Sequence, residues 1–264
     1  MTEHNGKGRV LLALTGWEPQ VWIDELRKAA PDRPVVLAPN GEADPDIDYA
    51  IVWKQPVGLL SKLPNLKAIF SLGAGVDHVF ADTSLPDVPI VRVVSANLTT
   101  RMSEYVVWQV LDHHRLGPRY RAQQAERIWD EDRDQKAAAD ITVGIMGLGE
   151  LGTDAAAKLQ VMGFNVTGWS RTQKQVEGVT CHAGAGGLDA FLASADIFVV
   201  LLPLTPETSE ILNKDLFRRM SKRGPLGAPV VINAGRGGLQ SEADILAALD
   251  EGLLSAVTLD VFQQ

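Results

Sequence analysis

A glycine-rich hexapeptide in the middle of the chain constrains the fold more than any other feature. Residues 147–152 read GLGELG, with glycine at the first, third and sixth positions. The apolar run of residues 141–146 before it is typical of a buried parallel strand. Residues 153–162 after it have the apolar spacing of a helix. Strand, glycine turn and helix in this order form the fingerprint of a dinucleotide-binding unit.

Each glycine of this motif has its own physical role. Gly147 permits the tight turn, Gly149 lets the backbone approach a pyrophosphate, and Gly152 lets the helix pack closely on the strand. The start of the helix adds backbone N–H groups and the positive end of the helix dipole, and both favour phosphate. The sequence therefore predicts a bound dinucleotide cofactor. Since the motif begins at residue 147, another module must precede it.

Composition excludes several classes of protein. A length of 264 residues allows two modest domains or one large one, and 45% hydrophobic and 22% charged residues are typical of soluble globular proteins. The net charge of -8 without a basic cluster argues against a nucleic-acid partner. A single cysteine, Cys181, excludes an internal disulfide and a cysteine-rich metal site, and we expect no metal. No signal peptide and no apolar run near the ~20 residues of a membrane span are present, so we expect a cytoplasmic protein without a membrane partner.

Strand-like and helix-like segments alternate along the whole chain, which predicts parallel, doubly wound α/β sheets. We expect a flavodoxin-like domain over residues 1–100 and a hinge helix with a Rossmann domain over residues 101–264. A charged, alanine-rich connector is expected at residues 130–140. The strands are predicted at residues 10–14, 35–37, 49–53, 66–71, 90–94, 141–146, 165–170, 179–182, 197–202, 230–234 and 256–261. Further helices are predicted at residues 17–30, from near 100 to at least 111 and towards 121, at 209–220 and at 241–251.

The end of the strand at residues 165–170 bears on the choice of cofactor. NAD-binding relatives of this fold usually have an acidic residue there, which binds the ribose hydroxyls. This chain instead has Arg171 between Ser170 and Thr172. A guanidinium flanked by two hydroxyls suits a ribose 2′-phosphate, and a carboxylate would repel one. The sequence favours NADP(H) over NAD(H), the alternative being that Arg171 is an ordinary loop arginine.

Two more strand ends carry polar groups to the edge of the sheet where ligands bind in open α/β folds. In residues 201–208, Pro203 ends the strand, and Thr205 and Pro206 suit the start of a helix. That segment is also simply a well-made turn. In residues 233–238, Arg236 emerges among small residues. Arginines beside glycines are common in turns, but one at this edge is suited to a substrate carboxylate.

Four ordered motifs, at residues 147–152, 201–208, 233–238 and 258–262, together resemble the D-isomer-specific 2-hydroxyacid dehydrogenases. The resemblance covers nearly the whole chain. It is closest to the glyoxylate/hydroxypyruvate reductase A type within that family. The segments that carry this closer match are residues 49–53, 72–77, 104–105 and 169–172.

The resemblance implies NADPH-dependent reduction of a small 2-keto acid, such as glyoxylate or hydroxypyruvate, by a homodimer whose first domain binds substrate. Arg236 would bind the substrate carboxylate and polarise the keto oxygen as the catalytic residue. Ala74 and Gly75 would offer backbone N–H groups to that carboxylate, and Trp53 would line the pocket. The implied cofactor-binding residues are Gly147, Leu148, Gly149, Glu150, Leu151, Gly152, Ser170, Arg171, Thr172, Leu202, Pro203, Thr208, Ala234 and Asp260.

The sequence departs from the family at one point. The family mechanism uses a histidine, paired with a glutamate, that protonates the substrate oxygen and follows Asp260 in chain order. The sequence ends at Gln264, and none of its five histidines is a substitute. We therefore expect the sequence to be part of a longer chain. Two alternatives stay open, a non-catalytic NADP-binding or redox-sensing protein and an NAD-linked dehydrogenase for another hydroxy acid.

Overall fold

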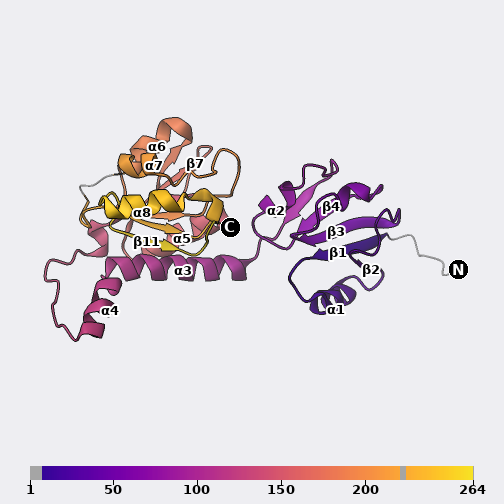
Figure 1. The fold of residues 1–264 in the computed structure, drawn as a ribbon, viewed down its shortest axis with the longest axis horizontal. Helices are drawn as coiled ribbons and strands as arrows, with labels where there is room; N and C mark the ends of the chain where they lie inside the picture. The colour runs from indigo at the N-terminus through magenta and orange to yellow at the C-terminus, as the bar shows by residue number, and fades with distance from the viewer. Residues whose placement is uncertain (1–7, 221–223, 264) are drawn as a thin grey trace. The chain divides into compact units, whose positions relative to one another are not determined.

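The computed structural model describes residues 8–220 and 224–263. The chain divides into two compact units, one up to Val94 and the other from Ser95 onward. The boundary expected from the sequence lies at residues 100 and 101. The long helix α3 (Ala96–His114) belongs wholly to the second unit. Each unit is built on its own β-sheet (Figure 1).

The sheet of the first unit is parallel, and its five strands in the described residues have the order β2-β1-β3-β4-β5. This is the flavodoxin-like order, in which the chain starts inside the sheet and then extends it on both sides. The parallel strands bring their carboxyl ends to one edge of the sheet. Their bounds are β1 (Arg9–Leu14), β2 (Val35–Leu37), β3 (Ile47–Trp53), β4 (Ala68–Ser71) and β5 (Ile90–Arg92).

The core of the first unit lies around β1 and β3. Leu11 in β1 and Ala50 in β3 are fully buried register partners. The predicted helix at residues 17–30 is observed as α1 (Pro19–Ala29), with proline in its first turn and no buried residue. The 3-10 turn η1 (Leu60–Lys62) and the short helix α2 (Asp77–Phe80) connect the later strands. Leu60 and Val79 from these two segments are fully buried in the same cluster.

The second unit has a six-stranded parallel sheet within the described residues, in the order β11-β10-β9-β6-β7-β8. From β6 the chain runs outward to β8, returns to β9 on the other side of β6, and runs outward to β11. This is the Rossmann order, whose switch point lies between β6 and β9. The predicted fold class is therefore confirmed. The bounds are β6 (Thr142–Met146), β7 (Asn165–Ser170), β8 (Thr180–Ala183), β9 (Ile197–Val200), β10 (Val230–Asn233) and β11 (Ala256–Leu259).

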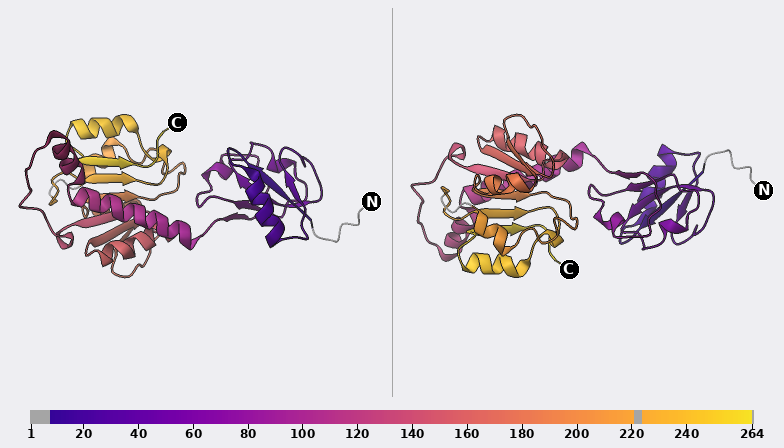
Figure 2. Two further views of the ribbon diagram at one scale, coloured as in Figure 1. Left: turned by 90° about the horizontal axis from the view of Figure 1, so that it is seen from below. Right: turned by 90° about the horizontal axis from the view of Figure 1, so that it is seen from above.

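Helices cover both faces of this sheet. One face packs on α3 and α5 (Glu150–Val161), which bury Val110 and Leu159. The other packs on α6 (Gly184–Leu192), α7 (Lys214–Arg219) and α8 (Glu242–Asp250), which bury Phe191, Phe217 and Ile245. In Figure 2, the magenta helix α3 crosses in front of the sheet in the view from below and lies behind it in the view from above. The central strand β9 (Ile197–Val200) is wholly apolar and fully buried, as expected for a parallel strand covered on two faces.

Two predicted helix boundaries are wrong. The long helix begins at Ala96 instead of near residue 100, and it ends at His114. Leu116 then has φ of +56°, which separates α3 from α4 (Gly117–Glu126). The helix expected at residues 209–220 begins only at Lys214, because the side chain of Asn213 caps it by accepting the Leu216 N–H at 3.0 Å.

The remaining segments contain two 3-10 turns, η2 (Ala138–Asp140) and η3 (Gly237–Leu239). The connector expected at residues 130–140 has only η2 as regular structure. Its side chains are exposed or partly buried. Cys181 lies in β8, as predicted, and is only partly buried. In the portion of the chain that the structure describes, no helix has both the length and the apolar character needed to cross a bilayer.

Candidate active site

The turn after β6 brings the outer glycines of the fingerprint into close backbone packing. Gly147 has φ of +112°, and its N–H donates to the carbonyl oxygen of Trp169 in β7 at 2.8 Å. A β-carbon on Gly147 would lie 2.8 Å from the carbonyl oxygen of Leu201. A β-carbon on Gly152 would lie 1.9 Å from the carbonyl oxygen of Gly147. Neither position leaves room for a side chain.

Gly149 differs from these two glycines because the protein leaves space beside it. An added β-carbon at Gly149 would meet no protein atom within 4 Å. Gly149 is also the N-cap of α5, and no side chain caps that helix end. The first N–H groups of a helix have no partner within the helix, and a phosphate can take that place. An open backbone cradle at the start of a 12-residue helix fits the pyrophosphate of a dinucleotide.

Arg171 follows directly after β7 at the same edge of the sheet. Arg171 and Thr172 are exposed, whereas Ser170 is buried and donates its hydroxyl to the carbonyl oxygen of Thr172 at 2.9 Å. The pKa of Glu207 lies below its ordinary value, mainly because its carboxylate accepts hydrogen bonds from its own N–H and from Thr205. The positive charge of Arg171 adds to this effect. Arg171 is therefore a solvent-facing cation, close enough to the turn after β9 to act on its charge.

The segment after β9 is a hydrogen-bonded turn and not the start of a helix. The hydroxyl of Thr208 accepts the N–H of Thr205 at 2.8 Å and donates to the carbonyl oxygen of Pro203 at 2.7 Å. The predicted helix start at Thr205 is therefore wrong, since a side chain competes with the backbone for these groups. Leu202 is buried, and Pro203 is exposed. The segment lies against the glycine turn through the close approach of Leu201 and Gly147.

The loop after β10 carries Arg236 at this edge of the sheet. Ala234 is buried, and its N–H donates to the carbonyl oxygen of Val200 in β9 at 3.1 Å. Asn233 accepts the N–H of Gly235 at 3.0 Å through Oδ1. Arg236 is partly buried, and its Nη1 donates to the carbonyl oxygen of Gly235 at 2.8 Å. The loop therefore holds the arginine close to its own backbone.

Asp260 follows β11 and lies beside the same loop. Its N–H donates to the carbonyl oxygen of Asn233 at 3.0 Å, and Asp260 itself is exposed. The pKa of Tyr105 on α3 is raised, mainly by burial and further by the negative charge of Asp260. The predicted cofactor residues of the second unit thus lie on five successive parts of one sheet edge, after β6, β7, β9, β10 and β11.

In the first unit, Trp53 ends β3 and belongs to an aromatic cluster. Its ring stacks on Trp17 with 4.9 Å between ring centres, and it lies 4.9 Å from the ring of His78. Trp17 also stacks on Trp22 at 5.6 Å. A β-carbon on Gly73 would lie 2.6 Å from the Trp53 ring. These contacts fix the orientation of Trp53 beside the turn that follows β4.

That turn contains Ala74 and Gly75. Ser71, the last residue of β4, accepts the N–H of Gly73 at 3.1 Å through its hydroxyl. Within the described residues, neither Ala74 nor Gly75 donates its backbone N–H to another group. Both residues are partly buried. Two adjacent N–H groups of this kind can bind an anion such as a carboxylate.

Sequence reasoning missed two residues near these groups. Trp17 was visible as an aromatic residue soon after the end of the first strand, but its stacking on Trp53 spans 36 positions of sequence. Gln240 is fully buried and hydrogen bonded to Asn233 at 2.7 Å. In the sequence, Gln240 stands out only as an amide residue between the apolar Leu239 and Ser241, the N-cap of α8.

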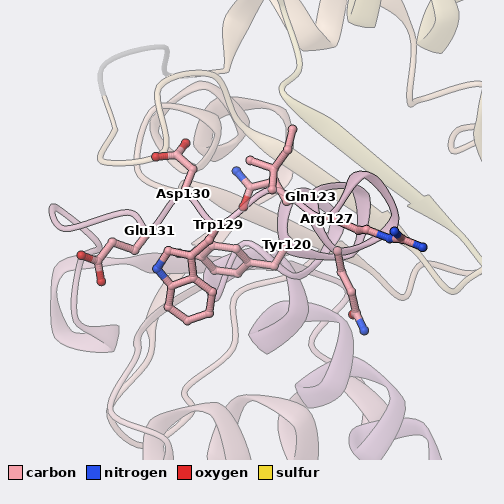
Figure 3. Close-up of a pocket in the computed structure, with 8 residues that line it drawn as sticks. Tyr120, Gln123, Arg127, Trp129, Asp130 and Glu131 are labelled. Carbon is pink, nitrogen blue, oxygen red and sulfur yellow. The ribbon is translucent and has the colours of Figure 1, made fainter.

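A separate cavity of about 660 Å³ lies on α4 and the segment that follows it. Figure 3 shows the ring of Trp129 close to that of Tyr120 in the view, with the carboxylate of Glu131 to the left of the indole and that of Asp130 above it. Trp129 is 92% exposed and Ile128 is 50% exposed. None of the predicted cofactor or substrate residues lines this cavity. In the described part of the chain, no group of acidic, cysteine and histidine side chains could hold a metal ion.

The sequence was compared with family models and with known proteins. The family model for the NAD-binding domain of D-isomer specific 2-hydroxyacid dehydrogenases matches residues 107–264. The chain belongs to the D-isomer-specific 2-hydroxyacid dehydrogenases. Glyoxylate/hydroxypyruvate reductase A of Yersinia enterocolitica is 37% identical over 254 residues, which cover 94% of this chain and 79% of that protein. The resemblance seen in the sequence motifs is therefore confirmed.

Solved structures of other 2-hydroxyacid dehydrogenases agree with the fold. The NADPH-dependent glyoxylate/hydroxypyruvate reductase of Sinorhizobium meliloti, in complex with NADP and sulfate, is 50% identical with a TM-score of 0.89. A probable 2-hydroxyacid dehydrogenase of Rhizobium etli, in complex with NADP, HEPES and tartaric acid, is 47% identical with a TM-score of 0.90. Both matches cover 98% of this chain and 82% of the other.

Proposed function

We propose that the chain is an NADPH-dependent reductase that converts a small 2-keto acid, of the glyoxylate or hydroxypyruvate type, to the 2-hydroxy acid. The names of the Yersinia and Sinorhizobium relatives give this activity. The observation that carries the proposal is the place of Arg236. It follows β10 at the same sheet edge as the glycine turn after β6, where this fold binds its ligands.

The residues at this edge fit a dinucleotide with a 2′-phosphate. The open backbone at Gly149 and the start of α5 suit the pyrophosphate. The exposed guanidinium of Arg171 suits the 2′-phosphate, and the hydroxyl-bearing Thr172 lies beside it. The remaining assigned contacts are Leu148, Glu150, Leu151, Ser170, Leu202, Pro203, Thr208, Ala234 and Asp260.

The substrate is assigned to groups that bind and orient a carboxylate. NADPH, when bound, supplies the hydride that adds to the keto carbon. Arg236 binds the carboxylate and stabilises the negative charge that grows on the keto oxygen. In the first unit, the N–H groups of Ala74 and Gly75 are assigned to carboxylate binding, and Trp53 is assigned to the pocket wall. A wall of fixed aromatic rings favours a substrate with a small side chain.

The oxygen of the reduced substrate also needs a proton. The family resemblance assigns it to a histidine that follows Asp260 in chain order, and the sequence runs to Gln264. Cofactor binding and carboxylate binding can be measured apart from turnover. A fluorescence titration with NADPH tests the first, and calorimetry with oxalate in the presence of NADP⁺ tests the second.

Turnover is tested by the loss of NADPH absorbance with glyoxylate or hydroxypyruvate. We expect keto-acid-dependent oxidation and its loss in Arg236→Ala. Arg218→Ala, which removes an exposed arginine on α7 paired with Asp215, is the matched control and keeps activity. Tight NADPH binding without oxidation by either keto acid, and without oxalate binding, would favour the non-catalytic alternative.

We further propose that two copies of the chain form a homodimer through α4 and the segment after it. The exposed Ile128 and Trp129 beside the 660 Å³ cavity support this proposal (Figure 3). Large exposed apolar side chains next to a hollow surface are typical of protein interfaces. The mass of the protein in solution tests it.

A further inference from the structure

Two fully buried amides lie directly below the loop that carries Arg236. The Nδ2 of Asn233 donates to Oε1 of Gln240 at 2.7 Å, and neither side chain is exposed to solvent. Asn233 is the last residue of β10, and Gln240 follows η3. Between them stand residues 234–239, so this one hydrogen bond closes the base of the loop.

The side chain of Asn233 makes two further hydrogen bonds to backbone groups of the loop. Its Nδ2 also donates to the backbone carbonyl oxygen of Arg236 at 3.1 Å. Its Oδ1 accepts the N–H of Gly235 at 3.0 Å. The backbone on both sides of the peptide bond between Gly235 and Arg236 is therefore held by a single buried side chain.

Gln240 connects the loop to the segment after β11. Its Nε2 donates to the carbonyl oxygen of Val261 at 3.0 Å and lies 3.4 Å from Oε1 of Glu242. A β-carbon on Gly237 would lie 1.8 Å from the carbonyl oxygen of Phe262, so the two segments pack backbone to backbone. Gln240 therefore connects the segment that contains Asp260 to the loop that contains Arg236.

Every amide proton of this pair has an acceptor. Each Nδ2 or Nε2 group has two N–H donors, and each makes two contacts. A fully satisfied polar network in a buried place specifies one arrangement of the groups it contacts. A loop residue that binds a ligand gains from such support because less ordering is needed when the ligand binds.

We infer that Asn233 and Gln240 are positioning residues, which hold the backbone of Arg236 so that its guanidinium meets the substrate carboxylate. This inference rests on the proposed function of Arg236. It goes beyond that function because it assigns specific roles to two fully buried amides beneath the loop. A purely structural pair would instead support the fold without any specific effect on Arg236.

A double-mutant cycle separates these two roles. Gln240→Met keeps the length of the side chain and removes its hydrogen bonds. We expect Gln240→Met to weaken oxalate binding to the NADP⁺ complex about tenfold, since small misplacements of a binding group have large effects. The affinity for NADP⁺ should change less than about twofold. In the Arg236→Ala background, Gln240→Met should have no further effect on oxalate binding, because the group that it positions is absent.

Gln109→Met is the matched control, since Gln109 is also a buried amide and accepts a hydrogen bond from the hydroxyl of Thr258 at 3.4 Å, away from the loop with Arg236. It should leave oxalate binding unchanged. Gln240→Glu, which keeps the acceptor for Asn233, is a second variant, and thermal denaturation reports whether each variant folds. Equal losses from Gln240→Met with and without Arg236 would overturn the inference, as would failure of both Gln240 variants to fold. If Arg236→Ala alone leaves oxalate binding intact, the proposed role of Arg236 fails and the inference fails with it.

Discussion

A β-carbon on Gly152 would lie 1.9 Å from the carbonyl oxygen of Gly147. The first turn of α5 therefore rests directly on the turn that leaves β6, and only a glycine allows this contact. The same packing places the start of the helix next to Gly149, where the protein leaves open space. Gly149 and Gly152 thus have different reasons to be glycine, since Gly152 is constrained by packing within the protein and Gly149 is directed at a ligand.

Gly152→Ala should lower both stability and cofactor affinity. The added carbon must push the helix away from the β6 turn, and overpacking of this kind costs about 1–3 kcal/mol of unfolding free energy. Because the displaced helix end is the one assigned to the pyrophosphate, NADPH binding should weaken as well. Thermal denaturation and a fluorescence titration with NADPH measure the two effects. A variant with normal melting temperature would contradict the close contact.

Gly149→Ala should separate these effects. Its β-carbon meets no protein atom within 4 Å, so the melting temperature should stay close to that of the original chain. The same carbon occupies space assigned to the pyrophosphate, and NADPH affinity should fall on the order of tenfold. Gly186→Ala in α6 is the control, because it also has no atom within 4 Å and lies outside the predicted site. Normal NADPH affinity in Gly149→Ala would contradict the assigned cradle.

Arg171→Ala should reduce the preference for NADPH over NADH. Removal of a charged hydrogen-bond partner of the 2′-phosphate costs about 1.5–3 kcal/mol, or a ten- to hundredfold loss of NADPH affinity. NADH lacks that phosphate, so its affinity should change little. Titrations with both cofactors measure the ratio. Arg219→Ala, at an exposed arginine that pairs with Asp189, should leave the ratio unchanged. Equal losses for the two cofactors would contradict the assignment of Arg171 to the phosphate.

The sequence predicted strands well where they are buried on both faces. Residues 197–202 were expected as a strand, and β9 covers Ile197–Val200. The two extra residues, Leu201 and Leu202, are apolar for another reason. Leu201 approaches Gly147 and Leu202 is buried beneath the turn, so their apolar character serves loop packing. An apolar run alone cannot distinguish a strand from the buried start of a loop.

Other features depended on contacts that local sequence does not contain. The N-cap of α3 is Ser95, a residue type that often precedes a helix, but its side chain makes no cap hydrogen bond. The predicted start near residue 100 therefore missed the first turn of this helix. The hydrogen bond from Gln240 to Val261 joins residues 21 positions apart. Arg236 could be singled out as a lone cation at a strand end, but the buried amides that hold its loop became visible only in the folded chain.

Buried histidines on α3 predict a loss of stability at mildly acidic pH. His113 lies 2.7 Å from the hydroxyl of Thr258, and burial is the main cause that lowers its pKa below the usual 6.5. Arg121 adds to this lowering and Asp112 opposes it. The pKa of His114 is lowered too, mainly by burial. Below about pH 6.5 the unfolded chain binds protons that the folded chain does not, so the free energy of unfolding falls until the pH passes the folded pKa.

The melting temperature should therefore be highest above about pH 6.5 and fall as the pH is lowered towards about 5.5. His113→Gln keeps a group that can contact Thr258 and removes one titrating site, so its melting temperature should fall less over the same interval. Scanning calorimetry at several pH values compares the two slopes. Identical slopes for the variant and the original chain would contradict the assigned role of His113.

The exposed side chains after α4 predict the oligomeric state. Trp129 is 92% exposed, and burial of a tryptophan against a second copy stabilises a dimer by about 4 kcal/mol. Light scattering should therefore give a mass near twice the 28.5 kDa of one chain. Trp129→Glu places a charge in the assigned interface, which should shift the protein to the mass of a single chain without changing its melting at low concentration.

Val57→Glu is the matched control for this prediction. Val57 is 73% exposed, lies in the first unit and does not line the cavity beside Trp129. The same change from an apolar to a charged side chain should leave the mass unaltered there. If Trp129→Glu and Val57→Glu both keep the double mass, the copies associate through another surface. If the unmutated chain already has the mass of one copy, Ile128 and Trp129 do not form a dimer interface, and the dimer proposal is wrong.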